Sequence, residues 1–441
     1  MYLVLRNGNV LNVETGIFTK QDILIEDSRI IQIEDDIESK DSYKEINCKG
    51  KWIIPGLIDM HVHIKYPFAP LFTAAGITTV RNTAGSVIEL EDLMIENPQR
   101  INPRVISADR MIDGPPGLWG ETSPYNLNTD IEEEARQEVR RQVELGADFI
   151  KVYGWLNKQT MEAVVDEAKK YNKEVSCDLI HSNSVTATDA ANIGIKWNEH
   201  CSGILQALFP EWTMKAPQNI WDTIDWEYPE EERVTEICRK LVSKNIILCP
   251  TMIIFDQANL LDHYWTINHP IIDRTEENEE LMNQWNRLLD YPSSLKSIGI
   301  QNQYIKQIAY IYHKLGGLVV AGTDTPAGIF TFPGLALHRE LMLFVESGFT
   351  EVEAIRAATV NAARALGRND LGSIQEKTIA DIVILNANPL MDIQNTMDIH
   401  LVIKGGIPLE NQDIFQHIPS QEQQDMFFDE LIAKFKAHQL L

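Results

Sequence analysis

The chain has 441 residues, of which 44% are hydrophobic and 23% are charged, and this composition is typical of a folded protein with room for one large α/β domain and an appended part. A formal net charge of −25 argues against a nucleic-acid partner, because a phosphate backbone requires a basic surface. No apolar run is long enough to span a bilayer and the first residues lack a secretory signal pattern, so we expect a cytoplasmic protein without membrane contacts.

Short strands separated by turns are predicted at both ends of the chain. Residues 2–54 alternate or cluster apolar side chains between Asn, Asp and Gly turns, and residues 381–403 again contain two strand-like runs. We therefore predict a small β-sandwich domain built from residues 1–55 and 371–415, which encloses a central domain of residues 56–370. Residues 416–441 form a helical pattern with one apolar side, which should dock on the central domain or on a second subunit.

The central domain alternates strand and helix patterns. Residues 131–145 and 161–171 carry apolar residues at helical spacing between strand candidates. Repeated β and α units over this length predict a (β/α)8 TIM-like barrel, whose active site lies at the carboxyl ends of its strands. The eight strand candidates are residues 56–63, 78–81, 103–107, 149–153, 174–177, 196–200, 246–250 and 318–322.

Metal-ligand residue types gather where these strands are predicted to end. His61 and His63 lie two apart on the first strand, so both imidazoles project from the same face, an arrangement that suits zinc and related metals. An isolated His-x-His more often consists of two ordinary histidines, and each residue at the other strand ends also has an ordinary structural explanation. Together they indicate a site, and the further candidates are Lys151, His181, His200 and Asp324.

The motifs that carry these residues extend over nearly the whole chain in a recognisable order. They lie at residues 55–63, 76–81, 146–152, 198–200, 321–324, 337–341, 357–363 and 379–383. In them the chain resembles the amidohydrolase superfamily, and within it the branch of imidazolonepropionase and the metal-dependent, prolidase-like Xaa-Pro dipeptidases. The resemblance implies a barrel with a split β domain, and hydrolysis of amide or peptide bonds with one or two divalent metals.

The same resemblance implies a role for each candidate ligand. His61, His63 and Asp324 would hold one metal, with zinc as the first expectation, and His181 and His200 would hold a second. Lys151 would bridge the two ions after its amine captures carbon dioxide as a carbamate. A hydroxide shared by the two metals would attack the substrate carbonyl, while Asp324 would act as general base and then as general acid.

One position departs from the family pattern. The fifth strand carries Asp178 where its core ends, and His181 follows three residues later. We assign the ligand role to His181 because its separation from residues 199–200 is about that of the family. This assignment requires a bulge near Asp178, and without one the second metal is in doubt.

Three further residue types are candidates for substrate contacts. Tyr153 lies two residues beyond Lys151 on the same face and would hydrogen-bond the substrate oxyanion, or simply pack. Arg81 and Arg110 would clamp a substrate carboxylate, although pairing with Asp or Glu is the commoner role of arginine. Trp119 would wall the pocket or plug a surface turn, and the helical insertion at residues 255–299 could form a lid.

The sequence thus predicts a metal-dependent hydrolase that cleaves an amide or peptide bond of a small-molecule substrate, such as a dipeptide or an N-acyl amino acid. A cyclic amidase or deaminase of the imidazolonepropionase type is the alternative enzyme, because the same metal site opens rings. A non-catalytic barrel scaffold is the alternative from another class. Homo-oligomerisation is left open.

Overall fold

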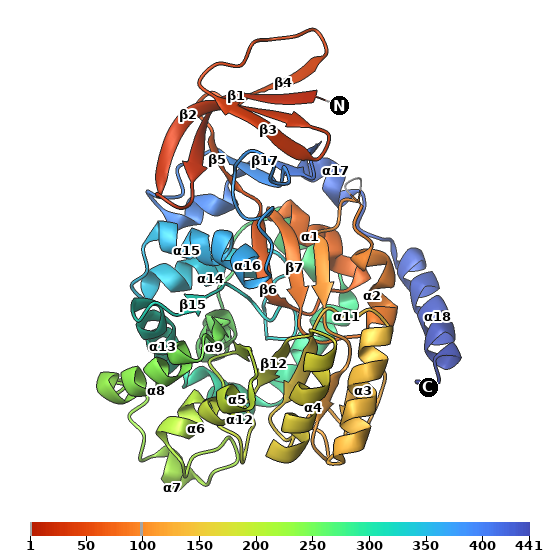
Figure 1. The fold of residues 1–441 in the computed structure, drawn as a ribbon, viewed down its shortest axis with the longest axis vertical. Helices are drawn as coiled ribbons and strands as arrows, with labels where there is room; N and C mark the ends of the chain where they lie inside the picture. Colours follow the sequence, from red (N-terminus) through yellow and green to blue (C-terminus); the bar gives the residue numbers. More distant parts are fainter. Residues whose placement is uncertain (1, 98–99) are drawn as a thin grey trace.

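An eight-stranded sheet joins the two ends of the chain in the computed structural model, which describes residues 2–97 and 100–441 (Figure 1). Its strand order is β18-β17-β16-β5-β1-β2-β3, with β4 beside β1. β16 pairs antiparallel with β5, so the carboxyl-terminal strands continue the amino-terminal sheet as predicted. The bounds are β1 Tyr2–Asn12, β2 Ile17–Glu26, β3 Arg29–Glu34, β4 Tyr43–Asn47, β5 Trp52–Pro55, β16 Ile382–Leu385, β17 Ile399–Lys404 and β18 Ile407–Leu409.

Eight parallel strands form the barrel. They lie in two sheets, and isolated parallel bridges between Ala108 and Phe149 and between Val62 and Thr325 connect the sheets at both edges. The predicted (β/α)8 order is therefore confirmed, with β9 Met111–Asp113 and β10 Asn126–Asn128 as extra short strands after the third barrel strand. The barrel strands are β6 Leu57–Val62, β7 Ile77–Asn82, β8 Arg104–Ser107, β11 Ile150–Tyr153, β12 Val175–Asp178, β13 Trp197–Glu199, β14 Ile247–Cys249 and β15 Leu318–Val319.

Amphipathic helices surround the barrel. In α4 (Lys158–Lys170), Met161, Val164, Val165 and Ala168 recur at helical spacing and are buried, and the Asn157 side chain caps the amino terminus. The predicted helices at residues 131–145 and 161–171 correspond to α3 and α4. The other helices around the barrel are α1 Ala69–Ala74, α2 Val87–Met94, α3 Glu132–Glu144, α5 Ala187–Ile193, α6 Ile204–Leu208, α7 Gln218–Trp221, α8 Glu231–Ser243, α13 Asn302–Lys314, α14 Leu335–Glu346, α15 Glu351–Ala357 and α16 Val360–Ala365.

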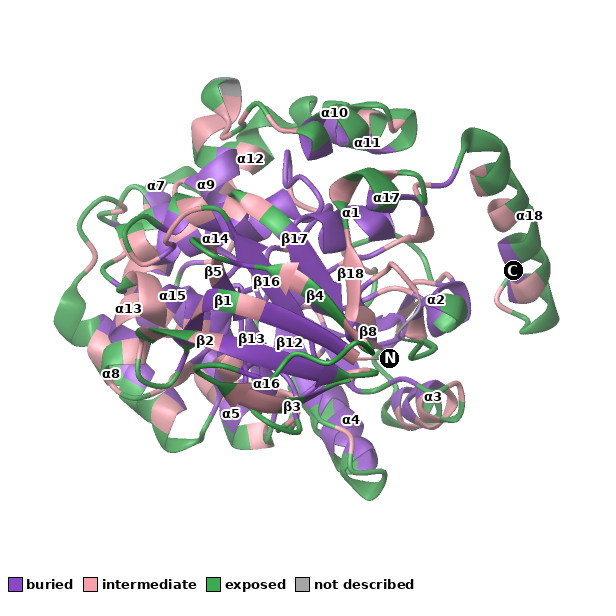
Figure 2. Ribbon diagram, turned by 90° about the horizontal axis from the view of Figure 1, so that it is seen from above, coloured by how far each residue is buried: buried purple, intermediate pink, exposed green. Residues whose placement is uncertain are grey.

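A helical insertion follows β14 and lies on one side of the molecule (Figure 2). Trp285 anchors it, because this side chain is fully buried and its indole N–H donates to the carbonyl oxygen of Pro326 at 2.9 Å. The insertion therefore packs against the loop that follows β15. It consists of α9 Met252–Leu260, η2 Leu261–His263, α10 Pro270–Glu276, α11 Glu279–Leu289 and α12 Pro292–Gly299.

The carboxyl-terminal helix α18 (Gln421–Ala437) docks on the barrel beside α2 (Figure 1). Leu431 and Phe435 are buried against Ile88, and the ring of Phe427 stacks on that of Tyr66 with centroids 4.8 Å apart. Of the two docking surfaces expected from the sequence, the barrel is the one observed. Within the described residues, no helix combines the length and apolarity needed to cross a membrane.

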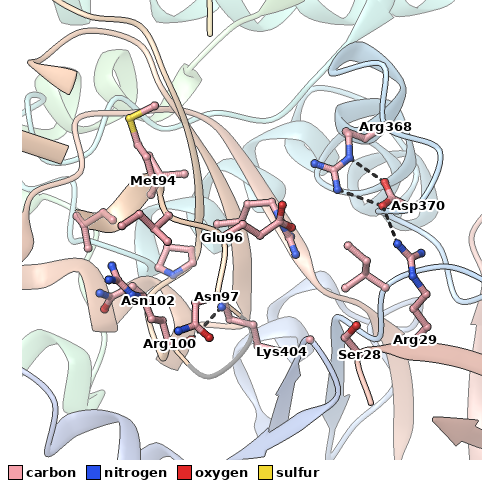
Figure 3. Close-up of a pocket in the computed structure, with 17 residues that line it drawn as sticks. Ser28, Arg29, Met94, Glu96, Asn97, Arg100, Asn102, Arg368, Asp370 and Lys404 are labelled. Carbon is pink, nitrogen blue, oxygen red and sulfur yellow. Dashed lines mark hydrogen bonds and ion pairs between the residues drawn. The ribbon is translucent and has the colours of Figure 1, made fainter. Parts of the chain in front are cut away.

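A cavity of about 580 Å³ lies where the small sheet meets the amino-terminal end of β8 (Figure 3). Several cations line it, but their charges are largely compensated: Arg368 pairs with Asp370 at 2.8 Å, and Arg104 pairs with Asp381 at 2.9 Å. In barrels of this kind, the amino-terminal face serves stability and not catalysis. We therefore interpret these ion pairs as a domain junction.

Candidate metal centre at the barrel mouth

His61, His63 and Asp324 converge at the carboxyl-terminal end of the barrel. The Nε2 atoms of His61 and His63 lie 3.0 and 2.9 Å from the same oxygen, Oδ1 of Asp324. The ligand atoms of all three residues lie within 4.8 Å of one another, a spacing that permits a single metal ion to contact all of them. Strand β6 and the loop after β15 are bridged at Val62 and Thr325, which explains why His63 and Asp324, 261 positions apart, meet here.

The second ring nitrogen of each histidine in the centre has a partner of its own. Nδ1 of His63 lies 3.2 Å from the carbonyl oxygen of Ala84, which only accepts, so this nitrogen carries the proton. Nδ1 of His61 faces Glu199 at 2.8 Å, and Nδ1 of His200 faces the hydroxyl of Thr251 at 2.6 Å. In neutral His63, the Nε2 atom therefore presents a lone pair to a carboxylate, an arrangement that needs a cation or an extra proton.

The charges around Asp324 support a cation at this point. Burial alone would raise the pKa of Asp324, but hydrogen bonds with His61 and His63 hold the pKa well below its usual range. Burial would lower the pKa of His61, yet Glu199 and Asp324 raise it above the ordinary value. Two ionised carboxylates therefore flank one imidazole, and the residues present fit a divalent metal.

His200 and Lys151 lie on the other side of His61. The rings of His61 and His200 have centroids 4.5 Å apart, and burial lowers the pKa of His200 to about 4, so this imidazole is neutral near pH 7. Lys151 is completely buried, and its Nζ atom has no hydrogen-bond partner among the described residues. A buried amine without a hydrogen-bond partner is costly, so Lys151 fits a group that is modified or that contacts a ligand.

His181 lies in the turn after β12 and not in the strand itself. It follows the end of β12 by three residues and lines the wall of the pocket, while Asp178 at the strand end faces His200 with Oδ2 at 3.5 Å from Nε2. The register between β11 and β12 is unbroken as far as the pair Tyr153 and Asp178. The ladder therefore has no bulge up to Asp178, and it ends before His181.

Three residues at these strand ends have a strained backbone. Asp324, His200 and Thr251 have φ values of 59°, 62° and 47°, which lie in the left-handed region that side chains with a Cβ rarely adopt. Such conformations persist where the surrounding structure imposes them, and they cluster at functional sites. Here these backbone conformations orient the carboxylate of Asp324, the imidazole of His200 and the Thr251 hydroxyl that contacts that imidazole.

The two arginines expected to bind substrate are paired with protein carboxylates. Arg81 is buried beneath the centre, where it donates to Glu199 at 2.9 Å and lies 4.0 Å from the ring centroids of Phe149 and Trp197. Arg110 donates through two nitrogens to Glu138. Neither guanidinium lines the pocket, so both arginines have the commoner role of pairing with a carboxylate of the protein.

Tyr153 and Trp119 do line the pocket beside the candidate ligands. Burial, together with the nearby carboxylates of Asp178 and Asp324, raises the pKa of Tyr153 well above its usual value. Its phenol therefore stays protonated and able to donate a hydrogen bond. Trp119 is 61% exposed and lies at the rim of the pocket.

The pocket itself has a volume of about 780 Å³ and is mostly apolar. The insertion supplies one wall through α9, α11 and α12, so the segment expected to form a lid does border the cavity. Lys215 lies at the rim with its ammonium 3.9 Å from the ring centroid of Trp155. Among the described residues, no carboxylate lies within ion-pairing distance of Lys215, so its charge is available to a ligand.

Sequence reasoning gave no role to two residues that shape the centre, Glu199 and Thr251. Each holds the Nδ1 side of an imidazole. Glu199 was visible next to His200 in a motif, but its partnership with Arg81 and His61 depends on three strands meeting in space. Thr251 lies two residues after the end of β14 and gave no signal in the sequence.

The match to a family model covers most of the chain: the amidohydrolase family model matches residues 52–408. In three dimensions, a prolidase solved in complex with N-methylphosphonate-L-proline is 20% identical and superposes with a TM-score of 0.69, over 93% of this chain and 100% of the other. At this identity, the superposition establishes a shared fold.

Two curated relatives match in part. A dihydroorotase of Syntrophotalea carbinolica is 46% identical over 67 residues, or 15% of this chain and 16% of the relative. The ochratoxinase of Aspergillus niger is 24% identical over 322 residues, or 68% of this chain and 54% of the relative. The matched segments span less than two thirds of the length of either relative.

Proposed function

We propose that this chain, which belongs to the amidohydrolase family, is a metal-dependent hydrolase that cleaves an amide or peptide bond in a small amphipathic substrate, such as a dipeptide or an N-acyl amino acid. The observation that carries this proposal is the convergence of His61 and His63 on one oxygen of Asp324 at the base of the pocket. Both Nδ1 atoms have partners, so both Nε2 atoms point to a common position.

The proposed metal centre has two positions. His61, His63 and Asp324 would hold one divalent ion, with zinc as the first expectation because imidazole and carboxylate suit it. His200 and Lys151 would contribute to the second position, with Lys151 modified by carbon dioxide to a carbamate that offers two oxygens. When bound, such ions polarise a carbonyl and lower the pKa of water.

The residues of the chain itself supply orientation and proton transfer. Asp324 borders both the histidine pair and the pocket, so it is placed to accept a proton from the attacking water and to donate it to the leaving amine. Tyr153 keeps its phenolic proton and would hydrogen-bond the oxygen that becomes negatively charged. Glu199 holds His61 in the required orientation.

The pocket favours a linear substrate with an apolar part and a negatively charged end. Its apolar lining and volume suit a bulky acyl or aromatic group. Lys215 and Lys65 line the same pocket, and Lys215 is available to a substrate carboxylate. A cyclic amidase would instead be expected to enclose a flat ring, so this lining supports the linear class.

A hydrolysis screen with defined metals tests the proposal. Purified protein is freed of metal by a chelator, reloaded with zinc or manganese in bicarbonate, and assayed against dipeptides, N-acyl amino acids and cyclic imides. We expect metal-dependent release of amine from linear substrates and its loss in Asp324→Asn. Turnover of cyclic imides alone would favour the alternative enzyme class, and a protein that binds no metal would favour the scaffold.

A further inference from the structure

Strand β12 ends in a carboxylate that is directed into the proposed metal centre. Asp178 is 7% exposed and continues the β11–β12 ladder without a register shift. Its Oδ1 atom accepts the backbone N–H of Ile180 at 2.9 Å, and its Oδ2 atom lies 3.5 Å from Nε2 of His200. One carboxylate oxygen is thus held by the backbone, while the other faces an imidazole whose Nδ1 is already engaged with Thr251.

His181 has different surroundings. It belongs to the turn after β12 and lines the pocket. Burial is the main reason that its pKa is lowered, and Lys215 lowers it further while Asp178 opposes both. In the described residues, no ring contact joins His181 to another histidine, whereas the rings of His61, His63 and His200 form close pairs.

Lys151 provides the independent observation at this position. Its side chain is completely buried on β11, next to β12, and its Nζ atom lacks any described hydrogen-bond partner. No ion pair links it to Asp178, so the carboxylate does not simply neutralise the ammonium. Lys151 lies on the strand beside the one that ends in Asp178, and the position of its Nζ atom 5.4 Å from the Tyr153 ring centroid is not a hydrogen bond. A buried amine without a hydrogen-bond partner indicates that a ligand belongs at this position.

We propose that Asp178, and not His181, is the β12 ligand of the second cation, and that His181 faces the substrate. The inference rests on the proposed function in that it takes the centre to have two metal positions. The second position then has one imidazole, one carboxylate and the proposed Lys151 carbamate, whereas the first has two imidazoles and one carboxylate. Since oxygen ligands favour manganese and magnesium more than imidazole does, the two positions differ in metal preference.

Metal stoichiometry tests this assignment without reference to catalysis. Metal-free protein is loaded with manganese in bicarbonate, and bound metal is counted by elemental analysis after removal of the excess. We expect two ions in the unaltered protein, two in His181→Asn and one in Asp178→Asn. Electron paramagnetic resonance should show the coupled manganese pair in the first two proteins and an isolated ion in the third.

Two further variants keep the result interpretable. Asp178→His restores an imidazole at the strand end, so we expect two ions again, with the second position shifted in preference from manganese to zinc. Asp166→Asn removes an exposed carboxylate from α4 and should retain both ions. Circular dichroism and thermal melting of each variant establish that it is folded.

Three outcomes would overturn the assignment: loss of one ion in His181→Asn, retention of two ions in Asp178→Asn, or a single ion in the unaltered protein. These results are independent of the substrate screen. Failure of every amide in that screen would count against the proposed function, whereas the ion count in Asp178→Asn decides only the ligand.

Discussion

The Nδ1 atom of His61 lies 2.8 Å from Oε2 of Glu199, and both residues are fully buried. The other oxygen of Glu199 accepts hydrogen bonds from Arg81 at 2.9 Å and from Ser176 at 2.5 Å. Burial would raise the pKa of Glu199, but Arg81 and His61 hold it well below the usual value. An ionised carboxylate therefore fixes the His61 ring so that Nε2 is directed at Asp324.

Glu199→Gln removes this charge and keeps the shape of the side chain. We expect metal affinity to fall about 10- to 100-fold, as for other orienting partners of histidine ligands. Stability should also fall by about 3–5 kcal/mol, because Arg81 loses the partner of its buried charge. Metal competition with a chromophoric chelator and urea unfolding measure the two effects.

Ser176→Ala is the matched control for Glu199→Gln, because it removes one hydrogen bond to the same carboxylate and leaves the charge. It should cost about 1 kcal/mol of stability and change metal affinity little. If Glu199→Gln retained full metal affinity, the orienting role of Glu199 would be wrong.

Lys215→Met removes the rim ammonium and preserves an apolar side chain of similar length. If this ammonium binds a substrate carboxylate, KM should rise about 5- to 10-fold for carboxylate-bearing substrates, with kcat little changed. The corresponding amidated substrates should show no such difference. Lys240→Met, at an exposed side chain of α8, removes the same charge away from the pocket and serves as the control.

Trp285→Ala should loosen the insertion from the loop after β15. The fully buried ring packs on Phe330 and Phe332, so its loss leaves a cavity that costs about 3–5 kcal/mol. Because the indole N–H also holds Pro326, two residues beyond Asp324, kcat should fall as well. Thermal melting and steady-state kinetics report the two effects.

Trp285→Phe keeps most of the packing and loses the hydrogen bond, so its stability should fall less than that of Trp285→Ala. Tyr228→Ala, at a side chain that is 70% exposed, should change stability by less than about 0.5 kcal/mol. Equal loss in all three variants would contradict the anchoring role of Trp285.

Lys404 lies at the domain junction shown in Figure 3, and its titration makes the free energy of unfolding depend on pH. Burial lowers the pKa of Lys404 to about 8, below the ordinary lysine value of 10.5. Between these values the unfolded chain binds more protons than the folded one, so stability gains from this group as pH rises from about 8 to 10.5. Relative to Lys404→Met, the unaltered protein should therefore become more stable across this window.

Urea midpoints of both proteins between pH 7 and pH 10.5 give this comparison. Lys20→Met, at an exposed position, controls for the loss of one positive charge. A constant difference between the unaltered protein and Lys404→Met over the whole range would contradict burial as the cause of the pKa shift.

Local patterns in the sequence determined the element types and their order. The spacing of Met161, Val164 and Ala168 predicted α4, because apolar residues at helical intervals form one buried face. The strand β6, which contains His61 and is followed directly by His63, was predicted from the sequence for a similar reason, since the strand period of two places these histidines on one face. Barrel topology then placed the strand ends, and with them Asp324 and His200, at one mouth.

Only the tertiary structure decided which polar side chains face one another. The sequence does not distinguish an arginine that binds a ligand from one that pairs with a buried carboxylate. In the folded chain, Arg81 pairs with Glu199 and Arg110 pairs with Glu138. The choice between Asp178 and His181 likewise depends on whether β12 keeps its register, and the ladder with β11 keeps it as far as Asp178. Secondary structure follows from short-range periodicity, whereas a ligand set depends on distances between strands that are remote in the chain.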